Sequence, residues 1–336
     1  MQQFHNVAII GAESELSQHL LSELEQREFP LAQLFPINVE AEVEEDRQLK
    51  WQGQSIDAAD PQLVNWSELS IAWLMSNQES ALDLAEQACQ LGCIVIDMVD
   101  AKPETATWVH ADLNPEHIAE GVTERWLSCP SSLAGQLSLL LHIIQQDVEL
   151  ERVEVNALLS AANKGKAGVD ELAGQTARLL NGLPVEAKLF PQQLAFNMLP
   201  EQGNELLQGS SEFEAELSLQ CRYLLQAPEL SINVSAMHVP VFYGDSLSVH
   251  LHATYALDRL TICEYLEQHS AFELIENELV TPVSNIANSD TISISRLRQN
   301  LSDERGLNLC LMANNPLAGV VKNAAQIGET LIKQYI

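Results

Sequence analysis

The sequence predicts an α/β protein, with a doubly wound parallel sheet in its N-terminal half and an α+β arrangement in the remainder. Before residue 130, short and almost wholly apolar runs alternate with segments of helical periodicity, which is typical of parallel strands covered by helices on both faces. After residue 150, apolar and polar residues alternate with a period of two, which fits an antiparallel sheet with one buried face. A chain of 336 residues is long enough for two such domains.

The composition fits a protein with substantial cores and a strongly acidic surface. Apolar residues make up 46% of the chain, and 17 basic against 47 acidic residues give a net charge of −30. Such a surface repels nucleic acid and anionic membranes, so neither is expected as a partner. There is no apolar run of 18 residues and no basic flank typical of a signal peptide, which favours a cytoplasmic location. The cysteines are dispersed, and no metal site is expected.

The start of the chain is typical of a dinucleotide-binding unit. The apolar run at 7–10 ends at Gly11, and leucines follow at helical spacing. Strand, glycine and helix in this order form the first turn of a Rossmann-like domain, where free N–H groups bind a pyrophosphate. The other two glycine positions of the fingerprint hold Ser14 and Ser17, which add bulk where the pyrophosphate must approach. Ser14 has a second interpretation, as the N-cap of the helix.

The loop after the second strand bears on the choice of cofactor. That strand is expected at 34–38, and five carboxylates follow within residues 40–46. In a Rossmann-like domain this point meets the adenosine ribose, where an acidic residue binds the hydroxyl of NAD and an arginine accommodates the phosphate of NADP. The acidic 40–46 loop therefore disfavours NADP and leaves NAD possible. A solvated loop without a ligand is the alternative, so no cofactor is required.

The remaining elements follow the same two patterns. In the first half, the pattern predicts a hairpin at 49–58, a strand at 71–75, a helix at 79–91 that ends at a glycine, and a further strand at 93–97. In the second half, the pattern predicts a strand at 153–159, a glycine-bearing loop at 160–168 and a helix at 169–180. Two later strands are expected at 231–235 and 248–254, and a closing helix at 318–334.

The segment 128–136 joins the two halves and is the candidate for chemistry. A strand at 125–128 runs into a turn at Pro130, and a helix is expected at 133–146. Backbone N–H groups converge at a strand-to-helix turn, which is why nucleophiles and anion sites are often found there.

Five segments in order resemble the aspartate-semialdehyde dehydrogenase family along essentially the whole chain. They are the Gly11 turn, Pro130-Ser131-Ser132 with Gln136, 196–200, 239–244 and 315–324. Within this family, the chain resembles divergent bacterial paralogues without an established activity. The resemblance implies a Rossmann-like domain at 1–130, with the C-terminal helix at 316–336 packed back on it, and an α+β catalytic-like and dimerisation domain at 131–315. It also implies that the protein forms a homodimer and that it binds a small molecule or a nucleotide.

The resemblance also indicates where catalytic residues would lie. In the family, a cysteine attacks the aldehyde, hydride passes to NADP, and phosphate cleaves the acyl thioester. Ser132 occupies the position of that cysteine, and Gln136 that of the active-site glutamine. Asp245 occupies the position of the acid/base histidine, and His238 that of the arginine that binds the substrate carboxylate.

The candidate cofactor-binding residues are Gly11, Ser14, Gly165 and Gly168. The last two retain part of the family's glycine-rich loop. The family's phosphate-binding lysine falls near Ala215, which carries no charge.

These replacements argue against dehydrogenase activity. The serine hydroxyl of Ser132 is far less acidic than a thiol and needs a positioned base, whereas Asp245, with an ordinary pKa near 3.9, is a weak one. His238 cannot form the bidentate fork of an arginine. Cys129 lies roughly 10 Å upstream along an extended strand and cannot replace the nucleophile. The prediction is a dimeric binding or scaffold protein without catalysis. The alternative is an NAD(P)-dependent oxidoreductase acting on an aldehyde or semialdehyde in amino-acid biosynthesis.

Two weaker patterns suit other chemistry. Ser132, His238 and Asp245 are the residue types of a hydrolase triad, but the turn is not of the G-x-S-x-G type. His250 and His252 share one face of a predicted strand, but no third metal ligand accompanies them.

Overall fold

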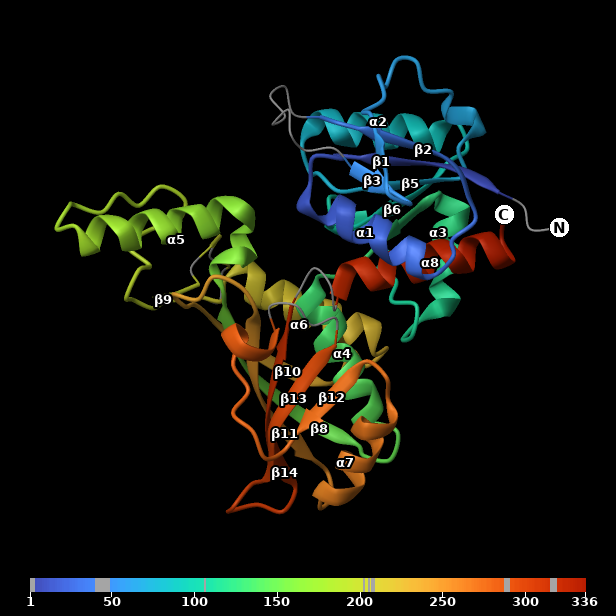
Figure 1. The fold of residues 1–336 in the computed structure, drawn as a ribbon. Helices are drawn as coiled ribbons and strands as arrows, with labels where there is room; N and C mark the ends of the chain where they lie inside the picture. The colour runs from blue at the N-terminus through green and yellow to red at the C-terminus, as the bar shows by residue number, and fades with distance from the viewer. Residues whose placement is uncertain are drawn as a thin grey trace. The chain divides into compact units, whose positions relative to one another are not determined.

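The computed structural model describes residues 4–39, 49–105, 107–201, 203–204, 206, 209–286, 291–314 and 319–336. The chain divides into two compact units (Figure 1). The first consists of Met1–Gly135 with Gly319–Ile336, and the second of Gln136–Ala318. The acidic 40–46 loop and residues 315–318 of the terminal motif lie outside the described residues.

Within the described residues, the first unit is built on a parallel sheet of five strands in the order β2-β1-β5-β6-β7. These strands are β1 (His5–Ile10), β2 (Leu31–Ile37), β5 (Ile71–Leu74), β6 (Ile94–Asp97) and β7 (Trp126–Ser128). The parallel sheet is as predicted, although β2 begins three residues before the expected 34–38. The strand after β1 is added on one side of β1, and the later strands of the sheet are added on the other side, beginning with β5. Such switch points in strand order are where open α/β sheets bind ligands.

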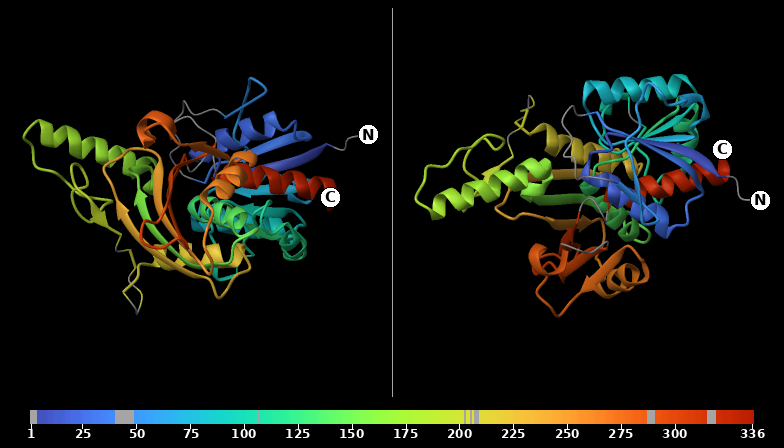
Figure 2. Two further views of the ribbon diagram at one scale, coloured as in Figure 1. Left: turned by 90° about the horizontal axis from the view of Figure 1, so that it is seen from below. Right: turned by 45° about the horizontal axis from the view of Figure 1, so that its top comes forward.

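Helices cover both faces of this sheet (Figure 2). They are α1 (Glu15–Gln26), α2 (Glu79–Gln90), α3 (Ile118–Glu124) and α8 (Val321–Gln334). Alternate residues of β1 enter two different cores: Val7 and Ile9 pack with α1 and α8, whereas Ala8 and Ile10 pack with α2. This alternation is why the strand is apolar throughout.

The closing helix α8 packs on the first unit. The indole Nε1 of Trp73 donates a hydrogen bond to the Ala324 carbonyl oxygen at 3.4 Å. Gly328 permits this contact, because a Cβ there would lie 2.9 Å from the Trp73 ring. The small hairpin of β3 (Leu49–Trp51) and β4 (Gln54–Ile56) forms where the sequence predicts it.

The second unit contains a sheet of seven described strands in the order β12-β13-β14-β11-β8-β10-β9. The strands are β8 (Leu150–Leu159), β9 (Leu199–Pro200), β10 (Ser231–His238), β11 (Asp245–Ala253), β12 (Phe272–Ile275), β13 (Ile292–Gln299) and β14 (Gly306–Ala313). The prediction of an antiparallel sheet is wrong in part, because β8 pairs with β10 and β12 with β13 in parallel. A period of two reports a buried face, but strand direction depends on the connections, and the long one from β8 to β10 permits a crossover.

One of this unit's helices packs on one face of the sheet, against β10. The longer helices of the unit are α4 (Ser132–Ile144), which begins in the first unit, α5 (Gly165–Leu180), α6 (Glu212–Leu224) and α7 (Arg259–Gln268). Ser218 of α6 donates to the Ile232 carbonyl oxygen at 2.9 Å, and Glu214 accepts from the Ala236 amide at 2.9 Å. The other face of β10 stays exposed, because its residues alternate between exposed and buried along the whole strand.

Short helical turns complete the described structure. They are η1 (Trp66–Glu68), η2 (Pro103–Thr105), η3 (Pro115–His117), η4 (Ala161–Lys164) and the π-type turn η5 (Pro282–Ile286). Among the helices described here, none has the length and apolar character that crossing a membrane requires.

Candidate active site

The turn after β1 keeps the shape of a dinucleotide-binding turn, but its first amides are already bonded. Gly11 has a φ of +81°, and a Cβ there would lie 2.8 Å from the Cβ of Ser76, so glycine is required. The amides of Gly11 and Ala12 both donate to the Ile37 carbonyl oxygen, at 2.9 and 3.0 Å. These two N–H groups point into the sheet and do not face a ligand.

The two serines of this turn have structural partners. Ser14 is the N-cap of α1 and accepts a hydrogen bond from the Leu16 amide at 3.3 Å, which confirms its second interpretation. The buried Ser17 hydroxyl lies 3.1 Å from the Met75 sulfur. Sequence reasoning missed Glu13, whose carboxylate accepts from the Val39 amide at 3.2 Å. This places a negative charge beside the turn in which a pyrophosphate would bind.

The Ser132 hydroxyl lies at the start of α4 and contacts the segment that leads into α8. Its Oγ accepts a hydrogen bond from the Val320 amide at 3.3 Å. A Cβ at Gly319 would lie 2.6 Å from that oxygen, so the contact depends on glycine. The candidate nucleophile is therefore a packed hydroxyl that joins two helix starts.

Gln136 lies one turn further along α4 and is 2% exposed. Neither its amide nitrogen nor its amide oxygen has a hydrogen-bond partner among the described residues. A buried amide without partners costs free energy, so this position offers a donor and an acceptor that a ligand can satisfy.

The carboxyl edge of the parallel sheet holds two further buried groups. Burial raises the pKa of the Cys129 thiol far above its ordinary value, which removes it as an alternative nucleophile. Asp97, at the end of β6, was not predicted as a site residue. Its carboxylate accepts from the amides of Val99 at 3.0 Å and Ala101 at 2.8 Å. Burial raises its pKa to about 6 despite these bonds.

In the second unit, the strand register brings His238 and Asp245 to the same edge of the sheet. His238 lies opposite Leu159 in the parallel pair of β10 and β8, and Ser246 lies opposite Leu158 in the antiparallel pair of β11 and β8. Both predicted residues therefore flank the carboxyl end of β8. The sequence contains no local signal for this proximity.

Asp245 anchors the turn that follows β8. It is 1% exposed, and its Oδ1 accepts hydrogen bonds from the amide and the hydroxyl of Ser160, at 2.6 and 2.7 Å. Its Oδ2 accepts from the side-chain amide of Asn163 at 3.2 Å. These hydrogen bonds commit both carboxylate oxygens to the turn, so the geometry does not present Asp245 as a proton acceptor for catalysis.

His238 is paired with a carboxylate from another strand. It is 3% exposed, and its Nε2 forms a short hydrogen bond with Glu201, while Lys164 Nζ lies 4.0 Å from the same carboxylate. The hydrogen bond from His238 is the main cause that lowers the pKa of Glu201. The ring of Phe190 contacts His238 edge-on at 5.3 Å between centroids. Sequence reasoning missed Glu201, although it directly follows Pro200 of the matching 196–200 segment.

The expectation of a loop at 160–168 is wrong. Residues 161–164 form η4, and α5 begins at Gly165, which has a φ of +67°. Gly168 lies in the first turn of α5, where a Cβ would overlap the Ala161 carbonyl oxygen. Two glycines within four residues predict a loop, but here Gly165 permits the sharp turn into α5 and Gly168 permits the close contact with Ala161.

The other candidate positions are occupied by ordinary structural residues. Ala215 lies within α6, and its amide donates to the Ser211 carbonyl oxygen. His250 Nδ1 lies 2.6 Å from the Asn308 side-chain oxygen, and His252 Nε2 lies 2.9 Å from Asp303. Over the described part of the chain, no group of three or more metal-ligating side chains is found.

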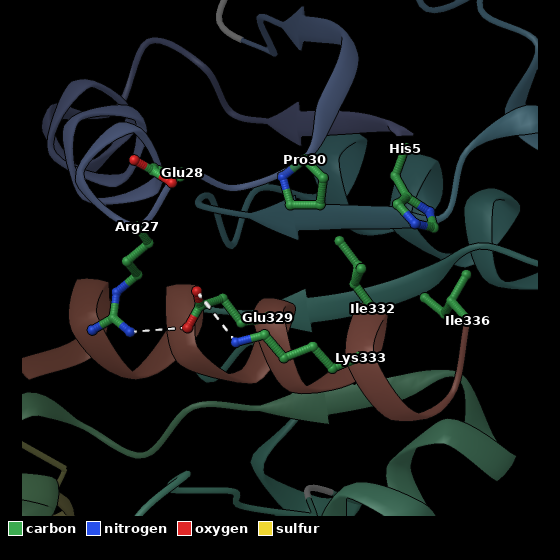
Figure 3. A pocket seen from close by; sticks show the side chains of 8 residues that line it. All are labelled: His5, Arg27, Glu28, Pro30, Glu329, Ile332, Lys333 and Ile336. Atoms are coloured by element: carbon green, nitrogen blue, oxygen red, sulfur yellow. Dashed lines mark hydrogen bonds and ion pairs between the residues drawn. The ribbon is translucent and has the colours of Figure 1, made fainter. Parts of the chain in front are cut away.

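A pocket of about 340 Å³ lies at the opposite, N-terminal edge of the parallel sheet (Figure 3). It is lined by His5, Arg27, Glu28, Pro30, Glu329, Ile332, Lys333 and Ile336. Three of its charged residues are paired with one another: Arg27 donates to Glu329 at 3.1 Å, and Lys333 Nζ lies 3.8 Å from Glu329. This chain of ion pairs links α1 to α8, and none of the predicted site residues lines the pocket.

Comparisons with known proteins match the whole chain. Residues 140–317 match the family model described as semialdehyde dehydrogenase, dimerisation domain. The chain is 32% identical over 338 residues to aspartate-semialdehyde dehydrogenase 2 of Vibrio cholerae, with all of both chains covered. It is also 32% identical over 338 residues, again with full coverage, to the USG-1 protein homolog of Pseudomonas aeruginosa.

Solved structures agree with these matches. The crystal structure of aspartate semialdehyde dehydrogenase II from Vibrio cholerae superposes with a TM-score of 0.92 at 32% identity, over 99% of this chain and 100% of that one. A structure of that enzyme complexed with ASA superposes equally well.

Proposed function

The chain belongs to the aspartate-semialdehyde dehydrogenase family, and on that premise we propose that it is a homodimeric member without dehydrogenase activity, acting as a binding or scaffold protein. The match of residues 140–317 to a dimerisation domain supports the homodimer. By the resemblance, three replaced residues would stand at the nucleophile, base and substrate-anchor positions, and the local structure at each supports the proposed loss of chemistry.

The pair of His238 and Glu201 is the observation that carries this proposal. The family resemblance assigns position 238 to an arginine that binds the substrate carboxylate. Here the side chain at that position already binds an internal carboxylate, and both groups are almost fully buried. A substrate carboxylate that approached His238 would meet the negative charge of Glu201, which opposes binding.

The environments of the other two positions support the same conclusion. Asp245 is held by Ser160 and Asn163, so it serves the fold of the η4 turn. The Ser132 hydroxyl accepts a hydrogen bond from Val320 and would need a positioned base to become a nucleophile. Transition-state stabilisation depends on all of these groups acting together, so their joint replacement removes it.

The turn after β1 gives little support for a bound dinucleotide. The amides of Gly11 and Ala12 are bonded to Ile37, and Glu13 adds a negative charge beside them. The acidic 40–46 loop disfavours NADP for the reason given above, and NAD remains the cofactor to test.

The alternative function is an NAD-dependent oxidoreductase acting on an aldehyde or semialdehyde. Gln136 favours it, because its buried amide groups have no partner among the described residues and lie one turn from Ser132. The name of the Vibrio cholerae relative, an aspartate-semialdehyde dehydrogenase, favours it as well.

One assay separates the two functions. The purified full chain is incubated with aspartate semialdehyde, phosphate and either NADP or NAD, and formation of the reduced cofactor is followed by absorbance. The Vibrio cholerae relative serves as the positive control. We expect no turnover above background with either cofactor. Robust turnover would refute the proposed loss of activity, and calorimetric binding of NAD or NADH would revive the alternative.

A further inference from the structure

The pocket at the N-terminal edge of the parallel sheet is lined by the end of α1 and the last turns of α8 (Figure 3). Both helices belong to the first unit, so the pocket is contained in one compact unit. Its volume of about 340 Å³ lies within the range of small-molecule sites. Because it lies at the edge opposite the turn after β1, a ligand bound here would be separate from the candidate active site.

The charged side chains around this pocket differ in how firmly they are held. Arg27 forms ion pairs with Glu23 at 2.7 Å and with Glu329 at 3.1 Å, which fix it between α1 and α8. Lys333 is 70% exposed, and its Nζ lies 3.8 Å from Glu329. Glu28 lines the pocket as well, and its carboxylate forms no ion pair with another described residue. The pocket therefore offers one available carboxylate and one loosely held ammonium group.

The other lining residues are apolar or uncharged. Pro30, Ile332 and Ile336 contribute apolar side chains. His5 is 3% exposed, and its Nδ1 lies 3.0 Å from the Ser70 hydroxyl. Burial lowers the pKa of this imidazole below its ordinary value of 6.5, so the ring is neutral at pH 7. The pocket thus combines side-chain charges of both signs with an apolar lining.

We propose that this pocket binds a free α-amino acid with an apolar side chain. The ammonium group of the ligand pairs with Glu28, its carboxylate pairs with Lys333, and its side chain covers Pro30 and Ile332. A simple anion is disfavoured, because the chain carries a net charge of −30. A simple cation would approach Arg27 and leave the apolar lining uncovered, whereas a zwitterion with an apolar group avoids both costs.

The backbone of Glu28 permits a test that spares the fold. Glu28 follows the C-cap of α1 and has a φ of +52°. Its amide donates to the Glu25 carbonyl oxygen at 3.0 Å, and the Phe29 amide donates to that of Leu24 at 2.9 Å. Glycine is the preferred residue at this left-handed position. Glu28→Gly therefore removes the carboxylate and should leave the midpoint of thermal unfolding unchanged or higher.

Gln226→Gly is the matched control for the backbone. Gln226 follows the C-cap of α6 and has a φ of +51°. Its amide and that of Ala227 make the same two hydrogen bonds, to the carbonyl oxygens of Tyr223 and Arg222, both at 3.0 Å. It belongs to the second unit and does not line the pocket. Both glycine variants should shift the thermal midpoint in the same direction, whereas only Glu28→Gly should alter binding.

The test is isothermal titration calorimetry of the full chain with five probes: L-leucine, L-isoleucine, L-valine, L-methionine and L-phenylalanine. We expect at least one of them to bind with a dissociation constant below about 1 mM. Free glycine, which lacks the apolar side chain, should bind at least about tenfold more weakly. Glu28→Gly should raise the dissociation constant of the bound amino acid by at least about tenfold, the effect of one charge-assisted contact. Gln226→Gly should leave it unchanged.

A second variant tests the carboxylate end of the ligand. Lys333→Gln should weaken binding of the amino acid by about tenfold. The amide derivative of the same amino acid has no carboxylate, so it should bind wild type and Lys333→Gln equally weakly. Lys188→Gln is the control, because Lys188 is 78% exposed and lies 3.7 Å from Glu186, outside the pocket.

The proposal requires that both pocket variants weaken binding. An amino acid whose dissociation constant either variant leaves unchanged overturns it, because the ligand then does not bridge Glu28 and Lys333. Absence of binding by all five probes up to about 10 mM overturns it as well. Neither result bears on the dehydrogenase assay, so failure here leaves the proposed loss of activity in place.

Discussion

The imidazole of His238 is bound through its Nε2 to the carboxylate of Glu201, although the two residues lie 37 positions apart in the chain. Their side chains are 4% and 6% exposed. This pair ties β10 to the residue that follows β9 and places a carboxylate beside the position where the family resemblance implies an arginine. Its energetic role can be measured directly.

Replacing Glu201 by glutamine should lower the free energy of unfolding at pH 7 by about 1–3 kcal/mol, because a buried hydrogen bond to a charged group is weakened. The pKa of Glu201 is lowered in the folded state, so its contribution is complete above its ordinary value of 4.5 and is lost as the pH falls through the folded value. Denaturant unfolding at pH 7 and pH 3 measures this difference between wild type and variant.

Glu186→Gln is the matched control for that experiment. Glu186 pairs with Arg178 at 3.2 Å, but its side chain is 58% exposed, so the change should cost no more than about 0.5 kcal/mol. A Glu201→Gln effect as small as this would show that the buried pair contributes little.

Replacing Asp245 by alanine should be strongly destabilising. It leaves the amide and hydroxyl of Ser160 buried without an acceptor, and each buried donor left unpaired typically costs about 1–3 kcal/mol. Asp245→Asn retains an acceptor oxygen for Ser160 and should cost less. Urea unfolding of both variants beside the exposed control Asp57→Ala checks the order. Equal stability of Asp245→Ala and wild type would remove the structural role given to this carboxylate.

Asp97 should give the free energy of unfolding a pH dependence opposite in sign to that of Glu201. Burial raises its folded pKa from 3.8 to about 6, so the folded state binds the proton more tightly than the unfolded state. Its contribution to the free energy of unfolding is most favourable below about pH 4 and declines by about 1–3 kcal/mol as the pH rises to about 6. The difference in unfolding free energy between wild type and Asp97→Asn, measured at intervals from pH 4 to 7, should follow this curve. A difference that does not vary with pH would contradict it.

Restoring the family residues tests whether the scaffold still supports the chemistry. A triple variant, Ser132→Cys, His238→Arg and Asp245→His, restores nucleophile, anchor and base, but the new arginine would pair with Glu201. Adding Glu201→Gln should release that arginine for the substrate carboxylate and lower KM by about tenfold relative to the triple variant, which corresponds to one ion pair of about 1.4 kcal/mol. The aspartate-semialdehyde assay described above measures both variants. Equal KM values would show that Glu201 does not obstruct the anchor position.

Much of the site could be located from the sequence, because the signals involved are local. The residues around Ser14 and Ser132 place both at helix starts, and the extended strand places Cys129 too far away to replace the nucleophile. The resemblance to a known family placed His238 and Asp245 as replaced positions. Their partners, Glu201 and Ser160, could not be predicted, because they are 37 and 85 residues away in the chain.

The sequence by itself determined the parallel sheet of the first unit, since apolar runs separated by helical periodicity report burial on both faces. It also determined the family, through motifs in order along the chain. Only the tertiary structure decided that β8 and β10 run parallel, that α5 begins at Gly165, and that a carboxylate pairs with His238. The physical reason is that periodicity reports which face of an element is buried, whereas strand order and crossover connections select the elements that meet there.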